Sequence, residues 1–82
     1  MRLDKFLKVS RLVKRRTVAA ELADGNHVDI NGKTAKPSAM VKVGDVLTLR
    51  FGNRTIRATI VRVPEKAVPA QEAESLYTLE TP

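Results

Sequence analysis

The sequence predicts an α+β fold in which two N-terminal helices pack on a small twisted antiparallel sheet. Apolar residues recur at helical spacing through residues 2–24, and from residue 28 onward they alternate with polar ones. Asn31-Gly32 and Gly52-Asn53 separate the alternating runs as hairpin turns. A chain of 82 residues buries only about 60 % of its extended surface, which allows a single domain with one modest core.

The first helix is expected near residues 2–9. Its apolar side consists of Leu3, Phe6, Leu7, Ser10 and Val13. Ser10 can equally end this helix or begin a turn, so the sequence leaves open whether the helix runs on through residues 11–16.

The second helix is expected over about residues 16–24. Val18, Leu22 and Ala19 are predicted to form its apolar stripe, and Gly25 is a plausible C-terminal stop.

Four strands follow from the alternation of apolar and polar residues. Pro37 and Pro64 end the second and the fourth, because proline lacks the N–H that a strand ladder needs. The strands are expected over residues 28–30, 33–35, 46–51 and 54–63.

The C-terminal stretch PAQEAESLY, residues 69–77, predicts a short helix with Ala73, Leu76 and Tyr77 packing back on the domain. We expect residues 1–64 to form the main domain. Residues 65–82 are expected to form a short acidic segment that packs back on it or stays partly flexible.

Charge is distributed unevenly along the chain. Residues 1–64 carry 14 Lys and Arg against 5 Asp and Glu, a net of +9, and residues 65–82 carry one Lys against four Glu, a net of −3. Seven of the cations fall within residues 2–16, where only Asp4 opposes them. Solvated surfaces usually intersperse both signs, so this clustering favours a polyanionic partner.

Several classes of function are disfavoured. The chain has no cysteine, so it can form neither a disulfide nor a thiolate metal site, and it shows no signal-peptide pattern and no apolar run of membrane-spanning length. His27 stands alone in a strand pattern, and no two carboxylates share a predicted site. We expect a cytoplasmic protein that is not an enzyme, with no catalytic residue, metal, cofactor or membrane contact.

Binding of nucleic acid is better supported. Arg2, Lys5, Lys8 and Arg11 lie on the polar side of the first helix, and Lys14, Arg15 and Arg16 cluster where the second begins. Guanidinium groups bond phosphate oxygens in a two-pronged fork, and the N–H groups at a helix start favour anions.

Structured RNA is the favoured partner. Aromatic residues are too scarce for a base-stacking platform, so recognition should rest on the backbone and on shape. A helix-turn-helix reader of DNA is the rival interpretation. The body of the second helix, TVAAELAD, contains no base-reading Arg, Asn or Gln, which disfavours it.

The combination of RLDKFL, SR...KRR, V.ING and KPS, spanning Arg2 to about Val63, resembles the RNA-binding domain named after small-subunit ribosomal protein S-four. Among its stand-alone members, the chain is most similar to the RqcP-like group of the fifteen-kilodalton heat-shock protein family. These share an EA…LY element, matched here by Glu72, Ala73, Leu76 and Tyr77. The heat-shock protein has a longer basic C-terminal extension, whereas this sequence has an acidic end.

The resemblance implies a bacterial ribosome-associated quality-control factor. Such proteins bind an obstructed large ribosomal subunit that still carries peptidyl-tRNA, contact both its rRNA and the tRNA, and support alanine tailing by an RqcH-like factor. A monomer is expected.

The resemblance also implies an RNA-binding surface, with Arg16 the foremost candidate for direct contact. Asp4 either supplies a helix-start charge, orients neighbouring Arg or Lys side chains, or accepts a bond from a base or ribose hydroxyl. The full set of implied RNA-binding residues is Arg2, Asp4, Lys5, Lys8, Arg11, Lys14, Arg15, Arg16, Lys33 and Lys36.

Three alternatives share the same surface. The protein could recycle large subunits in the manner of the heat-shock relatives. It could serve as the RNA-binding accessory of a modifying enzyme, or regulate another structured RNA as a translation repressor or ribosome assembly factor.

Overall fold

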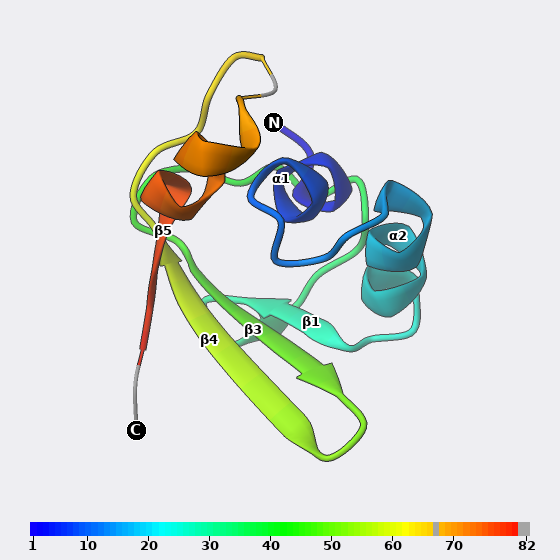
Figure 1. Ribbon diagram of the computed structural model, residues 1–82. Coiled ribbons are helices and arrows are strands. Elements are labelled where there is room, and N and C mark those ends of the chain that lie inside the picture. The colour runs from blue at the N-terminus through cyan, green and yellow to red at the C-terminus, as the bar shows by residue number, and fades with distance from the viewer. Residues whose placement is uncertain (67, 81–82) are drawn as a thin grey trace.

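Two helices cover one face of a five-stranded antiparallel sheet, which confirms the predicted α+β class (Figure 1). The computed structural model describes residues 1–66 and 68–80. The strand order is β2-β1-β3-β4-β5. In chain order the elements are α1 (Leu3–Val9), α2 (Arg16–Asp24), β1 (Val28–Ile30), β2 (Lys33–Thr34), β3 (Val46–Phe51), β4 (Arg54–Ile60), the 3-10 helix η1 (Ala70–Leu76) and β5 (Tyr77–Leu79).

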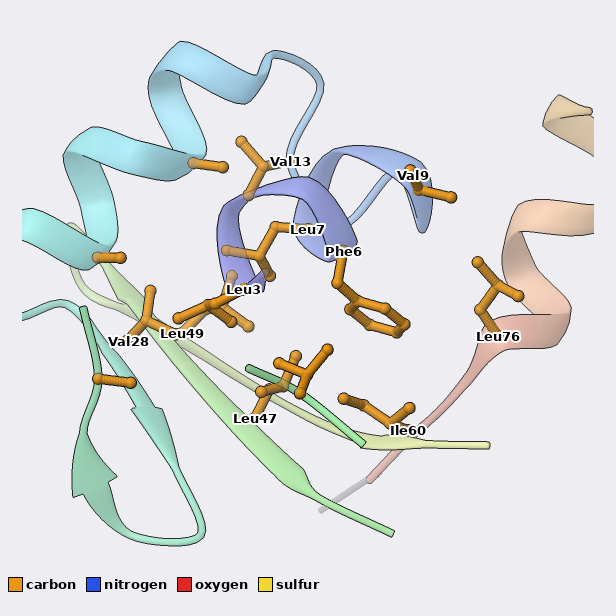
Figure 2. Close-up of a cluster of buried hydrophobic side chains, with 14 residues drawn as sticks. Leu3, Phe6, Leu7, Val9, Val13, Val28, Leu47, Leu49, Ile60 and Leu76 are labelled. Carbon is orange, nitrogen blue, oxygen red and sulfur yellow. The ribbon is translucent and has the colours of Figure 1, made fainter. Parts of the chain in front are cut away.

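The core lies between α1 and the sheet (Figure 2). Phe6 is fully buried on α1, and Leu47 and Leu49, two residues apart on β3, are fully buried on the sheet face below it. Ile60 from β4 and Leu76 from η1 close the core on the side away from α2. Helical spacing and strand alternation therefore predicted both faces of this core correctly.

The first helix ends at Val9, which settles the question that the sequence left open. Ser10 is its C-cap, fully buried, and its hydroxyl donates to the carbonyl of Leu7 (3.2 Å). Arg11 follows in the left-handed conformation, with φ of 62°. Because that backbone turn cannot continue a helix, residues 10–15 form a loop that leads into α2.

The predicted stripe of α2 was wrong at Val18, which is 40 % exposed. Ala19 and Ala23 are the fully buried residues of this helix, and Leu22 is half-buried. Residues four apart share one helix face, and these small side chains leave room for α1 to lie close by. The orientation of α2 is thus set by its neighbour rather than by its largest apolar residue.

The C-terminal region differs from the expected helix over residues 69–77. It forms the shorter 3-10 helix η1, and Tyr77 begins strand β5 instead of ending a helix. Ile60 of β4 faces Tyr77, and Ala58 faces Leu79. The fourth strand also ends earlier than expected, at Ile60, because the main-chain N–H groups of Val61 and Arg62 turn to the carbonyl of Leu76.

Asn31 and Asp45 do more than form turns. Asn31 adopts φ of 52° in the hairpin between β1 and β2, and its side-chain amide donates to Asp45 (3.0 Å) while its oxygen accepts from the N–H of Val46 (2.9 Å). Asp45 is 3 % exposed and also accepts from the N–H of Lys42 (3.0 Å). These two side chains therefore tie the first hairpin to the start of β3.

Replacing Asp45 with alanine is expected to lower the free energy of unfolding by about 1–3 kcal/mol, because the side-chain amide of Asn31 and the main-chain N–H of Lys42 lose their charged, buried acceptor. Urea denaturation followed by circular dichroism measures the change. Asp24→Ala is the matched control, since Asp24 is exposed at the C-terminal end of α2. Equal stability of the two variants would show that the Asn31–Asp45 contact contributes nothing.

Candidate nucleic-acid interface

Asp4 holds the side chains of two arginines that are far apart in sequence. It is 4 % exposed, and its carboxylate lies 3.2 Å from a guanidinium nitrogen of Arg2 and 3.5 Å from one of Arg16. It also accepts from the main-chain N–H of Lys5 (2.7 Å). The two arginine side chains remain about half exposed, at 50 % and 49 %. We call Arg2, Asp4 and Arg16 the Asp4 clamp.

The N-terminal end of α1 is fixed by a segment more than thirty residues later in the chain. The N–H of Leu3 donates to the carbonyl of Ala39 (2.7 Å), and that of Asp4 donates to Pro37 (3.2 Å). Arg2 and Met40 form an isolated antiparallel bridge. The KPS motif is therefore part of the support for the clamp.

Met40 was not among the residues predicted for this interface. It is 66 % exposed and pairs directly with Arg2, so an apolar side chain flanks the clamp. Only the bridge between residues 2 and 40 reveals this neighbour, and no local pattern around Met40 indicates it.

A second group of cations lies at and beyond the C-terminal end of α1. Lys8, Arg11 and Lys14 line one surface hollow, which we call the basic hollow. All three side chains are exposed. Arg15, also exposed, is the N-cap of α2 and donates no side-chain bond there, so the positive end of the helix adds to the local potential.

The structure does not gather all the predicted residues. Lys5 is half-buried on α1, where its main-chain N–H contacts the clamp. Lys36 bonds Asn26 through its ammonium group (3.2 Å) and directly precedes Pro37. Lys33 lies exposed in β2 at one edge of the sheet, and within the described residues no ion pair or side-chain hydrogen bond joins it to the clamp or the hollow.

Most arginines of the sheet are neutralised within the protein. Arg50 forms a two-pronged pair with Asp29 (2.7 and 3.1 Å), and its hydrogen bonds lower the pKa of Asp29 below the ordinary value. Arg57 pairs with Glu80 at 3.2 Å, and Arg62 lies 4.0 Å from Glu72. The C-terminal residues Glu72 and Glu80 thus compensate the positive charges of Arg62 and Arg57.

The basic hollow, by contrast, keeps its charge. Among residues 1–66 and 68–80, none of its three side chains takes part in an ion pair. A helical layer with uncompensated cations, set on a sheet most of whose arginines are paired, indicates a protein of the polyanion-binding class.

The described ranges contain no gathering of three or more His, Cys, Asp or Glu side chains that would suit a metal ion. His27 is exposed just before β1. No helix among the described residues combines the length and the apolar character that crossing a membrane requires.

Comparison with known proteins agrees with this class. The family model of the S4 domain matches residues 1–47. An RQC P-site tRNA stabilizing factor from Listeria innocua is 53 % identical over 79 residues, covering 96 % of this chain and 85 % of the relative. Heat shock protein 15 from Escherichia coli is 40 % identical over 77 residues, covering 94 % of this chain but 58 % of its own length.

The fold is similar to that of a solved relative. The trimeric structure of Vibrio cholerae heat shock protein 15 superposes with a TM-score of 0.87 at 36 % identity, covering 98 % of this chain and 81 % of that one. The chain belongs to the S4 domain family. The resemblance stated from the motifs, including its heat-shock and RqcP-like branch, is therefore confirmed.

Proposed function

We propose that this protein binds a large ribosomal subunit that carries peptidyl-tRNA and stabilises that tRNA during ribosome-associated quality control. Relatives of nearly the same length, at 42–53 % identity, carry the name RQC P-site tRNA stabilizing factor, which supports this role. The structural observation behind the proposal is the Asp4 clamp, because it presents two guanidinium groups at one place on an RNA-binding fold.

The clamp would act by organising its arginines before RNA arrives. A flexible arginine loses about 0.5–1.5 kcal/mol of side-chain freedom when it is immobilised in a complex. Asp4 already restrains Arg2 and Arg16, and each keeps about half of its side-chain surface open to phosphate oxygens. One buried carboxylate between two guanidinium groups leaves the clamp with a net charge of +1, so it still attracts RNA.

The proposal places the protein in the bacterial cytoplasm, where it acts by binding and without catalysis. Its partners would be large-subunit rRNA and the tRNA, and it would support an RqcH-like factor that adds alanine to stalled chains. We expect it to act as a monomer. Size-exclusion chromatography with light scattering checks this expectation, and the trimeric state named for the Vibrio cholerae relative is the competing result.

Binding to the subunit should weaken steeply with salt. The logarithm of the association constant is expected to fall by about 0.7–0.9 per contacted phosphate for each unit in the logarithm of the salt concentration. Titrating labelled protein with purified large subunits carrying peptidyl-tRNA, at several KCl concentrations, measures the slope. A slope near zero would contradict an interface built on the clamp and the basic hollow.

A recycling role like that of the heat-shock relatives is the second candidate, because Escherichia coli heat shock protein 15 is 40 % identical over 94 % of this chain. Deleting the gene separates the two roles. Loss of alanine tails on stalled chains supports the proposed function, whereas intact tails with accumulated obstructed subunits support recycling.

A further inference from the structure

Arg11 occupies a backbone position that suits glycine. It directly follows the C-cap of α1 with φ of 62°, and helices that end this way usually carry glycine there. A non-glycine residue in the left-handed region costs about 1–2 kcal/mol. The protein accepts this cost at a position where a smaller residue would fold more easily.

Nothing in the described structure repays the cost through the arginine side chain. The turn is held by main-chain bonds, from the N–H of Arg11 to Lys8 (3.1 Å) and from that of Val13 to Leu7 (3.1 Å), together with the Ser10 hydroxyl. Glycine at position 11 would keep all of these bonds. The guanidinium of Arg11 is exposed, and in residues 1–66 and 68–80 it has neither an ion-pair partner nor a side-chain hydrogen bond.

The strained residue lies where two other cations converge. Lys8, Arg11 and Lys14 line the same hollow, and no carboxylate from the described part of the chain lines it with them. Three uncompensated positive charges around one concavity repel each other, and a bound anion relieves this repulsion. Phosphate fits the donors well, because guanidinium offers a two-pronged fork and each lysine adds a charge-assisted bond.

The basic hollow and the Asp4 clamp share no residue, and among the described residues no ion pair or side-chain hydrogen bond joins them. Lys8 lies four residues after Asp4 in the last turn of α1, whereas Arg11 and Lys14 lie beyond that helix, in the loop that leads to α2.

We propose that Lys8, Arg11 and Lys14 form a second phosphate site, which holds a backbone phosphate of the RNA independently of the Asp4 clamp. The proposal rests on the proposed function, since the same RNA-bearing subunit supplies this phosphate. Arg11 is the residue that specifies the site, and its left-handed backbone is the cost in stability of placing a guanidinium there.

The decisive variant is Arg11→Gly, because it removes the guanidinium and relieves the backbone strain together. The variant is expected to melt at the same or a higher temperature than the wild type. Its affinity for large subunits carrying peptidyl-tRNA should fall by about tenfold, the effect of losing a hydrogen bond to a charged group. The salt slope should become shallower by about 1.

Two further variants separate strain from charge. Arg11→Ala keeps the strained backbone, so it should bind as weakly as Arg11→Gly but melt at a lower temperature. Arg11→Lys keeps a positive charge in the hollow and should bind within a few-fold of the wild type. If Arg11→Gly binds like the wild type with an unchanged salt slope, the second phosphate site does not exist.

A parallel measurement on Arg16→Ala distinguishes this failure from failure of the proposed function. If Arg16→Ala weakens binding and Arg11→Gly does not, the clamp stands and only the hollow is refuted. If the wild type itself does not bind the subunit, the proposed function fails first, and the hollow proposal falls with it. The double variant should lose the product of the two single fold-changes, because the two sites act independently.

Discussion

Replacing Arg16 with alanine is expected to release the protein from large ribosomal subunits while leaving the fold intact. Arg16 begins α2, about half of its side chain is exposed, and its guanidinium contacts Asp4 at 3.5 Å. Alanine favours the helix, so little stability should be lost. The affinity should drop by roughly 10- to 100-fold, since a hydrogen bond to a charged group contributes about 1.5–3 kcal/mol.

Sedimentation through a sucrose gradient measures the effect, because bound protein travels with the large subunit. Arg57→Ala is the matched control. It removes the same charge, but Arg57 lies on β4 and is paired with Glu80 at 3.2 Å. We expect this control to remain with the subunit. If Arg16→Ala co-sedimented with the subunit at the wild-type level, the Asp4 clamp would not be part of the RNA-binding interface.

Truncating Leu76 to alanine is expected to lower the free energy of unfolding by about 2–5 kcal/mol. Leu76 is fully buried and packs with the core from η1, and the N–H groups of Val61 and Arg62 both bond its carbonyl. A large cavity at this point would reach toward Phe6 and Ile60 (Figure 2). For a domain of this size, such a loss is a large share of the total stability.

Leu79→Ala provides the comparison for Leu76→Ala. Leu79 is the same residue type three positions later, in β5, but it is 49 % exposed. Thermal and urea melts of the two variants should differ clearly, with Leu79→Ala within about 0.5 kcal/mol of the wild type. If Leu76→Ala lost as little stability as Leu79→Ala, the C-terminal segment would lie on the domain without contributing to its core.

Local periodicity was sufficient to predict the buried residues of a helix or strand that buries only one side. The alternation around Leu47 and Leu49, and the helical spacing of Leu3 and Phe6, each reflect a single buried side. Val18 was misplaced because the buried face of α2 is chosen by contact with α1, which favoured alanine. A three-residue strand such as β5 carries too short a pattern to be recognised beforehand.

The site shows the same division between local and long-range information. Charge clustering identified Arg2 and Arg16, and it singled out Asp4 as the acidic exception. The contacts that join these three residues depend on the loop of residues 10–15, so the spacing alone left three roles for Asp4 open. In the structure Asp4 contacts two arginines and the N–H of Lys5, which joins the orienting role to the helix-start role. The bridge from Arg2 to Met40 lies entirely outside the reach of local patterns.

The support of α1 by distant segments sets an order of events during synthesis. Residues 2–16 leave the ribosome before their anchors, which follow at residues 37–41, in β3 and β4, and finally at Leu76. Short helices such as α1 are unstable in isolation, so the emerging basic segment should remain unstructured until those anchors appear. A newly made copy would therefore acquire its grip on RNA only after the chain through Leu76 has been made.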